Sequence, residues 1–318
     1  MPGNPPAQPP GNPPPRYALR RQRNGSMALY HGGFGETMHP GLGPWREANR
    51  LYVEGGGLEN LLRNGNKGPL VLFDVGLGGA ANAVAAITCH QRLQHGGRQP
   101  RPLRIISFEA EPAMPAFALE QADRLDYLRG FEDALGTLLR EGVAELPGSI
   151  RWELRLGDFT ALIAEEPERA ELIFYDPFSP TSNPAMWRVE TLEALYRCRR
   201  PDGATRLITY SAAISARAAM MLAGFYVGEG PQLEGGHDTT EAAGWPRLLS
   251  QPLPPAWLGK ALRSKALFGP DVPPTRQSAM REALREHAQW GEVDDAALAP
   301  PPRKKVRRGY KPRRRGGA

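Results

Sequence analysis

Runs of consecutive apolar residues alternate with helical patterns through the middle of this chain. Such runs are typical of strands buried on both faces of a sheet. The strands predicted from apolar runs or apolar–polar alternation are 70–75, 103–108, 150–156, 172–175 and 205–210. The predicted helices are 80–94, 113–142 with a break near 124–126, the segment behind 183–184, and 212–223. This order predicts an α/β fold with a doubly wound, mostly parallel sheet.

Shorter elements are predicted on both sides of this alternation. Gly43-Pro44 is a helix-start signal and predicts a helix over about 44–51. Asn183 before a proline predicts a second start, with Asn183 as the N-cap. Segments 225–227 and 247–250 are predicted to pair as closing strands.

Prolines and charges divide the chain into four parts. Residues 1–25 are Pro-rich and hold four arginines and no acid, so we expect a disordered segment. Residues 26–270 are expected to form one domain, and 271–302 a Pro-rich linker with a short helix. Residues 303–318 hold nine basic and no acidic groups, which predicts a disordered basic tail. The remaining 26–302 carry 27 basic and 34 acidic groups, a net charge of −7.

Several classes of protein are excluded by what the sequence lacks. The longest apolar stretches fall far short of the ~20 residues of a membrane helix, and residues 1–25 show no secretory pattern. The two cysteines, Cys89 and Cys198, cannot form a disulfide framework or a four-thiolate zinc site. The six histidines do not fall at metal-ligand spacings, so no metal is expected. We therefore expect a cytoplasmic protein; its oligomeric state is left open.

Acidic residues follow four of the predicted strands, at or just beyond the point where each strand ends. They are Asp74, Glu109, Asp158 and Asp176. Ligands of doubly wound sheets bind beyond the carboxyl ends of the strands. Carboxylates beside a hydrophobic sheet are costly unless they bind something. The four acids therefore predict a ligand site at this edge.

The glycine-rich loop after the first buried strand predicts a nucleotide-like ligand. Gly76 and Gly78 allow close approach of the backbone, and the next helix offers free N–H groups. Asp74 would suit the ammonium group of S-adenosylmethionine, whereas it would repel the pyrophosphate of NAD. Asp158 would suit the adenine amine. Glu109 would accept from ribose hydroxyls with either cofactor, so Asp74 and Asp158 favour S-adenosylmethionine.

Asp176-Pro177-Phe178 follows the fourth strand and resembles the D/N-P-P-Y/F loop of amino-group methyltransferases. An amine is protonated at neutral pH and must lose a proton before it can attack. A carboxylate such as Asp176 can orient the amine and accept that proton. Pro177 would stiffen the loop, and the face of Phe178 tolerates a cation.

A longer resemblance surrounds this loop. Residues 175–187 resemble the D-x-F-x-P-x-x-N-P-x-x-W signature of the methyltransferase domain that makes 5-methylaminomethyl-uridine at the tRNA wobble position. The resemblance covers roughly 23–268 and includes segments 35–39, 47–48, 51–55, 106–109, 156–158, 263–265 and 268–269. In many bacteria this domain is fused to an FAD-dependent oxidase. No second G-x-G-x-x-G follows here, so we expect the stand-alone form.

The resemblance implies a Rossmann-like class I methyltransferase that uses S-adenosylmethionine and acts on tRNA. By resemblance, Asp176 contacts the acceptor amine, and Asn82 belongs to the donor loop with the two glycines. The residues implied to shape the acceptor pocket are Glu36, His39, Pro177, Phe178, Asn183 and Trp187. The basic tail and the N-terminal arginines are expected to attract tRNA phosphates, and Tyr310 could stack on a base.

Three other functions remain open at this stage. The neutral to acidic stretch 235–244 leaves room for methylation of a different amine on the same scaffold. An altered glycine loop leaves room for a catalytically dead methyltransferase fold that binds RNA. An aminopropyltransferase fits less well, because Asp74 would then lack a partner on the cofactor.

Overall fold

The computed structural model describes residues 16–63, 68–233, 236–268 and 272–291. Within these residues, eight strands form one sheet whose central five strands are parallel. In spatial order they are β10 (Tyr226–Glu229), β11 (Thr240–Ala243), β9 (Arg206–Thr209), β8 (Leu172–Tyr175), β4 (Leu70–Val75), β5 (Leu103–Glu109), β7 (Ile150–Leu156) and β6 (Val143–Leu146). The doubly wound, mostly parallel sheet is thus confirmed, with antiparallel strands at both edges.

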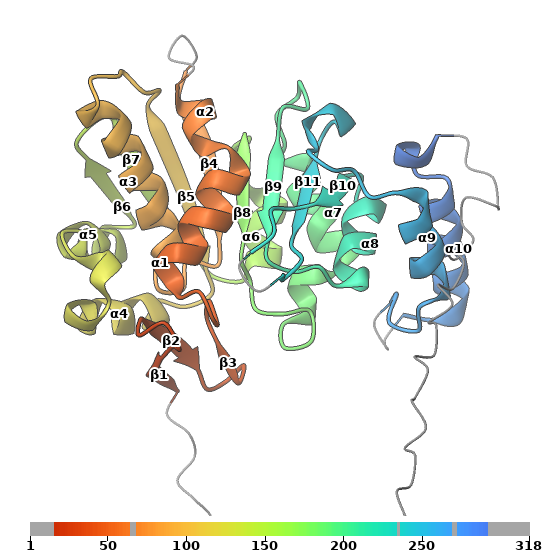
Figure 1. Cartoon of the computed structure of the whole chain (residues 1–318), viewed down its shortest axis with the longest axis horizontal. Helices are drawn as coiled ribbons and strands as arrows, with labels where there is room; N and C mark the ends of the chain where they lie inside the picture. Colours follow the sequence, from red (N-terminus) through yellow and green to blue (C-terminus); the bar gives the residue numbers. More distant parts are fainter. Residues whose placement is uncertain (1–15, 64–67, 234–235, 269–271, 292–318) are drawn as a thin grey trace, which may run out of the picture.

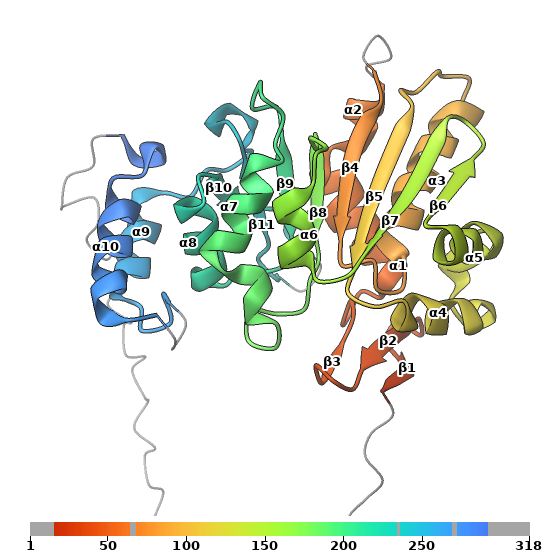
Figure 2. The same ribbon diagram turned by 180° about the vertical axis from the view of Figure 1, so that it is seen from behind.

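Helices cover both faces of this sheet. One face carries α1 (Pro44–Glu47), the π-helix η1 (Ala48–Glu54), α2 (Leu58–Leu62) and α3 (Ala81–His95), which lie in front in Figure 1. The other carries α6 (Phe159–Glu165), α7 (Val189–Arg197) and α8 (Ile214–Leu222), which lie in front in Figure 2. Leu72 and Phe73 are adjacent in β4, fully buried, and belong to the two opposite cores. This explains why the parallel strands are continuous apolar runs.

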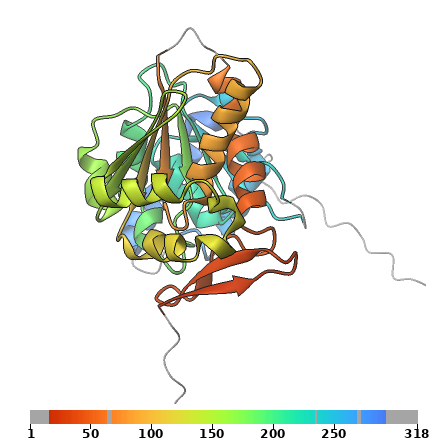
Figure 3. The same ribbon diagram turned by 90° about the vertical axis from the view of Figure 1, so that its left-hand side faces the viewer.

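A small antiparallel sheet lies at the carboxyl ends of the central strands (Figure 3). It contains β1 (Tyr17–Arg21), β2 (Met27–His31) and β3 (Glu36–Thr37). The expected disorder up to residue 25 is therefore wrong for β1, whereas residues 1–15 lie outside the described part. The reason is Tyr17, whose ring packs edge-on against His31 and whose hydroxyl donates to Glu111 over 3.0 Å.

The remaining elements extend the two helical layers. Between β5 and β6 lie α4 (Ala113–Glu120), the short turns η2 (Ala122–Arg124) and η3 (Asp126–Leu128), and α5 (Glu132–Glu141). Toward the C-terminus lie η5 (Pro246–Leu248), α9 (Pro255–Arg263), α10 (Pro274–Arg285) and η6 (Ala288–Trp290). In the part of the chain described by the structure, no helix has the length and apolar character to cross a bilayer.

The short helix expected within 271–302 is present as α10, but the described residues of this segment pack on the domain and do not form a free linker. Helix α10 packs on α8 and α9, and Leu284 at its end is fully buried. Trp290 is buried as well and stacks on Trp257 at 6.4 Å between ring centroids. These apolar side chains attach 272–291 to the core. The tail 303–318 and the rest of 292–318 lie outside the described residues.

The closing strands also differ from the expectation. β10 confirms the strand predicted near 225–227, but its partner is β11 and not 247–250, which contains η5. The sequence of β11 is polar at two of its four positions, yet all four are buried. Glu241 is tolerated there because Arg206 on β9 lies 3.0 Å from its carboxylate. The edge strand β6 follows α5 and was not predicted.

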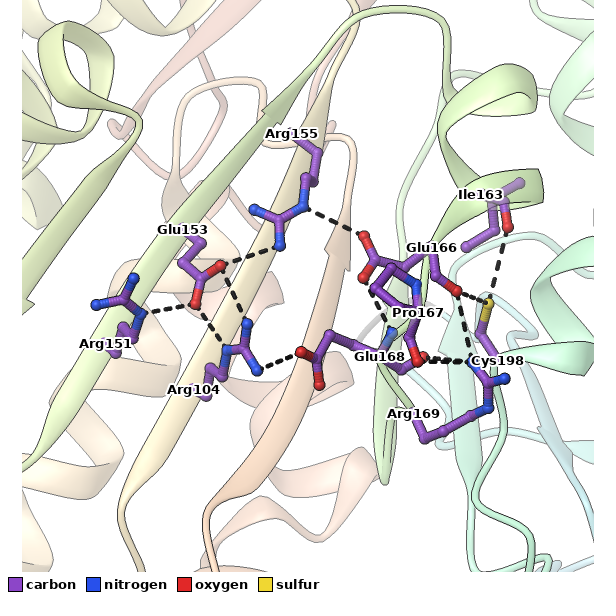
Figure 4. A network of polar contacts seen from close by, with 10 residues as sticks. All are labelled: Arg104, Arg151, Glu153, Arg155, Ile163, Glu166, Pro167, Glu168, Arg169 and Cys198. Carbon is purple, nitrogen blue, oxygen red and sulfur yellow. Dashed lines mark hydrogen bonds and ion pairs between the residues drawn. The ribbon is translucent and has the colours of Figure 1, made fainter.

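Charged residues cover the face of β5 and β7 beside α6 (Figure 4). Arg104, Arg151 and Arg155 converge on the buried Glu153 at 2.7, 2.8 and 3.0 Å. Arg104 also pairs with Glu168 at 2.7 Å, in the segment between α6 and β8. The network therefore ties this segment, which leads into β8, to the neighbouring strands.

We expect Glu153→Gln to lower the free energy of unfolding by about 1–3 kcal/mol, because charge-assisted hydrogen bonds of a buried group are lost. Burial alone would raise the pKa of Glu153, but the three arginines outweigh it and lower the pKa to about 2. This contribution is therefore present above the ordinary pKa of 4.5 and disappears as the pH falls toward 2. Denaturant unfolding at pH 7 and pH 3 measures both effects.

Glu145→Gln is the matched control, because Glu145 is 64% exposed and contacts only Arg151 in this network. It should change stability by no more than ~0.5 kcal/mol. Equal losses in the two variants would show that the network contributes nothing specific.

Candidate active site

Two loops meet beyond the ends of neighbouring strands. Val75 at the end of β4 is in register with Tyr175 at the end of β8, so the segments that follow start side by side. Gly76 has φ +91°, and a Cβ placed on it would lie 2.7 Å from the backbone oxygen of Asp176. Only glycine fits this contact between the glycine loop and the Asp-Pro-Phe loop.

A cavity of about 390 Å³ opens between the glycine loop, the end of β5 and the small sheet. Its wall includes Gly76, Gly78, Glu109 and Asp158 together with apolar side chains such as Phe108. The size is within the range of small-molecule sites, and mostly apolar walls with a few polar groups are typical of them. We name it the donor cavity.

Glu109 fixes the shape of this cavity. Its carboxylate accepts hydrogen bonds from the N–H groups of Gly78 at 2.8 Å and Ala110 at 2.9 Å. Burial raises the pKa of Glu109, and these bonds oppose the rise. Asp158 is exposed and accepts from the N–H of Thr160, so it caps α6. Both acids line the donor cavity, and their contact with a ligand stays a prediction.

Asp74 has a different position from the one expected. It is fully buried and is not among the residues that line the donor cavity. One carboxylate oxygen accepts from the hydroxyl of Ser107 at 2.7 Å, and the other has no partner among the described residues. Burial raises the pKa of Asp74 to about 7, with Asp176 and Glu109 adding to the rise.

A second cavity of about 440 Å³ lies on the other side of the Asp-Pro-Phe loop. It shares Met38, Asp176, Pro177 and Phe178 with the donor cavity. We name it the acceptor cavity. Its wall also contains Glu36, His39, Glu47, Ser179 and Tyr210. The loop thus separates two cavities that meet at Asp176, which is the arrangement that transfer of a group between two ligands requires.

Asp176 is nearly buried and has defined partners. Its Oδ2 accepts from the side-chain amide of Asn82 at 2.8 Å and lies 3.9 Å from His39 Nε2. Burial raises the pKa of Asp176 to about 6, while His39 and Asn82 oppose the rise. At pH 7 this carboxylate is mainly ionised and has the pKa of an efficient proton acceptor. Asn82, expected at the donor, thus orients Asp176 instead.

Two residues near Asp176 were not singled out as site residues from the sequence. Glu47 on α1 lies 3.2 Å from Nδ1 of His39, and both side chains are buried. Tyr52 on η1 is fully buried, and its hydroxyl lies beside the carboxylate of Asp176. Both fall inside or beside segments that resemble the family. No spacing pattern in the sequence indicates that α1 and η1 reach β8.

Other residues expected in the acceptor pocket hold the Asp-Pro-Phe loop in place. Glu36 accepts from the hydroxyls of Ser179 and Ser182, each at 2.5 Å. Phe178 stacks on Phe34 with ring centroids 4.2 Å apart, and its backbone oxygen accepts from the indole N–H of Trp187 at 2.9 Å. Trp187 lines neither cavity, so it supports the loop from behind.

Asn183 also departs from its expected role. Its side chain makes no capping hydrogen bond, and the residues behind it form the 3-10 turn η4 (Pro184–Trp187) before α7 begins. Asn183 lines the donor cavity and not the acceptor cavity. The 3-10 turn explains the difference, because the α-helix starts five residues later than a cap at Asn183 requires.

The described residues contain no cluster of three or more His, Cys, Asp or Glu side chains suited to a metal ion. The donor cavity fits S-adenosylmethionine. Gly76 permits close backbone approach, Glu109 offers carboxylate oxygens to hydroxyl groups, and Phe108 provides an apolar wall.

Comparison with known proteins agrees with this geometry. Residues 134–243 match the model of a family described as S-adenosyl-L-methionine-dependent methyltransferase. A tRNA 5-methylaminomethyl-2-thiouridine biosynthesis bifunctional protein MnmC from Acidovorax sp. (strain JS42) is 28% identical over 224 residues, covering 69% of this chain and 34% of the relative. The same protein of Delftia acidovorans is 31% identical over 206 residues, covering 62% and 30%. The chain spans about a third of the length of these curated relatives.

Among solved structures, MNMC2 from Aquifex aeolicus has the same fold. The TM-score is 0.63 at 22% sequence identity, with 87% of this chain and 85% of that chain covered. This confirms the Rossmann-like class I architecture. Residues 134–243 therefore match a family of S-adenosyl-L-methionine-dependent methyltransferases, and the chain is similar in sequence to part of the bifunctional tRNA-modifying proteins.

Proposed function

We propose that the chain methylates the 5-aminomethyl group of the wobble uridine in tRNA. The observation that carries this proposal is the position of Asp176, a buried carboxylate at the boundary between the donor and acceptor cavities. The names of the bifunctional relatives indicate a tRNA substrate. The carboxylates that line the acceptor cavity are suited to binding an amine. Methylation of an unrelated amine is not favoured by any observation beyond the neutral 235–244 stretch.

Different residues would bind the donor and accept the proton in this reaction. S-adenosylmethionine, when bound, supplies a methyl group on a positively charged sulfur. Gly76, Gly78, Glu109 and Asp158, which line the donor cavity, would hold it. Asp176 would bind the incoming ammonium group and accept one of its protons, which leaves a lone pair on nitrogen for the attack.

The acceptor cavity would position that nitrogen. Pro177 and Phe178 restrict the opening between the cavities, and Glu36 fixes the loop through two serines. Holding nitrogen, carbon and sulfur in line supplies most of the rate enhancement in such a displacement. His39, close to both Asp176 and Glu47, contributes a positive charge beside the carboxylates.

The direct test uses tRNA from a strain that lacks this protein. Incubation with the purified protein and S-adenosylmethionine should add one methyl group to 5-aminomethyl-uridine, as seen by mass analysis of the nucleosides. A labelled product that is not tRNA would support another amine. Absence of donor binding in calorimetry would instead support a dead fold.

We expect Gly76→Ala to weaken binding of S-adenosylmethionine about 10-fold or more, equivalent to ~1.4 kcal/mol. The new methyl group would collide with the backbone of Asp176. Gly130→Ala is the matched control, because Gly130 has φ +84° but open space around it. It imposes the same backbone strain without the collision and should leave donor affinity, measured by calorimetry, unchanged. Equal affinities in the two variants would remove the donor assignment.

We expect Asp176→Asn to lower turnover about 100-fold or more while donor binding persists, because an amide cannot accept the proton. In the wild type, kcat/KM should rise as the pH increases through about 6, where Asp176 becomes ionised. The variant should lack this rise. Asp126→Asn, at a side chain 90% exposed, is the control and should behave as wild type. Near-normal turnover of Asp176→Asn at pH 7 would exclude Asp176 as the proton acceptor.

We propose that the basic tail and the N-terminal arginines attract tRNA in the cytoplasm. Arg16 pairs with Glu111, and Arg20 lies over the ring of Tyr30, 3.4 Å from its centroid. Arg21 is exposed on β1, and Arg23 lies in a hollow that adjoins the acceptor cavity. In this proposal these two side chains would meet phosphates close to the site.

Removal of residues 303–318 should flatten the plot of log K against log salt by roughly 3 units, if about half of its nine basic groups contact phosphates. Turnover at saturating tRNA should change little, because Asp176 is untouched. Removal of residues 1–15, which carry no charged side chain, is the matched control. An unchanged salt slope without the tail would show that the tail does not bind tRNA.

A further inference from the structure

Glu47 lies where the acceptor cavity meets a second hollow. It lines the acceptor cavity and also an outer hollow of about 690 Å³, and the two share Pro40, Glu47 and Tyr210. The side chain is nevertheless only 7% exposed. A buried carboxylate at such a place needs a partner that compensates its charge.

His39 provides that compensation and connects two carboxylates. Its Nδ1 lies 3.2 Å from Oε1 of Glu47, and its Nε2 lies 3.9 Å from Oδ2 of Asp176. The backbone of His39 has φ +52°, an unusual conformation for a residue other than glycine. The two ring nitrogens thus face opposite carboxylates, which is the geometry of an imidazolium between two anions.

Resting on the function proposed above, we propose that Glu47 is a positioning residue that acts through His39. Glu47 keeps the imidazole of His39 protonated, and protonated His39 keeps Asp176 ionised and oriented for the acceptor amine. Glu47 itself takes no proton from the substrate. Without Glu47, a smaller fraction of His39 would be protonated at pH 7, and the positive charge beside Asp176 would weaken.

The surrounding charges agree with this assignment. Burial lowers the pKa of His39, but the hydrogen bond and charge of Glu47, with the charges of Asp176 and Asp74, outweigh it and raise the pKa to about 9. His39, Asn82 and Tyr52 lower the pKa of Asp176, whereas the charge of Glu47 raises it. The effect of His39 is larger than that of Glu47, so Glu47 favours the ionised form of Asp176 only through His39. Among the described residues near the site, His39 is the cation, because no lysine or arginine lines the acceptor cavity.

The test begins with a titration that needs no catalysis. The ring signals of His39, assigned by comparison with His39→Asn, are followed by NMR from pH 5 to pH 10. We expect a midpoint near 9 in the wild type. In Glu47→Gln we expect a midpoint about 1–3 units lower, the usual effect of removing an adjacent carboxylate. A wild-type midpoint near the ordinary 6.5 overturns the proposal without any variant.

Kinetics then connect the titration to Asp176. Glu47→Gln should lower kcat/KM at pH 7 about 10-fold, and the defect should shrink as the pH rises, because Asp176 becomes ionised again. A merely structural role would give a loss that does not depend on pH, and that result overturns the proposal. Glu47→Asp keeps the negative charge and should retain the raised midpoint of His39. This variant provides the test if Glu47→Gln does not fold.

Glu54→Gln is the matched control on the neighbouring π-helix. Glu54 is 58% exposed and pairs with Arg50, so its substitution should change neither the His39 midpoint nor the pH profile. The two proposals fail differently. If the acceptor is not tRNA, the shift of His39 in Glu47→Gln still appears. If Glu47 does not act through His39, the midpoint stays unchanged although Asp176→Asn is inactive.

Discussion

The contact between the glycine loop and the Asp-Pro-Phe loop is the constraint on which the rest of the site depends. β4 and β8 are neighbours in the sheet, and the absence of a side chain at Gly76 lets the backbone of Asp176 pass within contact distance. Because of this contact, one carboxylate borders both cavities. A larger residue at position 76 would separate the loops and, with them, the donor from the acceptor.

Burying acids at this edge of the sheet costs free energy. Hydrogen-bond donors and positive charges beside each acid offset part of that cost. Asp74 has a single hydroxyl donor, and burial raises its pKa to about 7. Asp176 has an amide donor and a histidine, and its pKa rises less. Glu153, on the opposite face of the sheet from α3, is held by three arginines and has the lowest pKa of these acids. The number and charge of the donors therefore decide which buried acid stays ionised.

The sequence predicts the central sheet and the strand-end acids well, because continuous apolar runs have one favourable placement in a parallel sheet. It does not predict β1 or β11, whose pairing depends on distant partners such as Glu111 and Arg206. For the site, the Asp-Pro-Phe loop carries its own chemical signature. Glu47 does not, because its role arises only when α1 packs beside the loop after β8.

A crystal structure with S-adenosylhomocysteine bound tests the two-cavity account most directly. The account predicts the nucleoside in the donor cavity, its ribose hydroxyls on Glu109, and the sulfur facing the gap between Asp176 and Phe178. The acceptor cavity should then lie directly beyond the sulfur. A ligand bound outside the donor cavity, or a sulfur that points away from Asp176, would contradict the account.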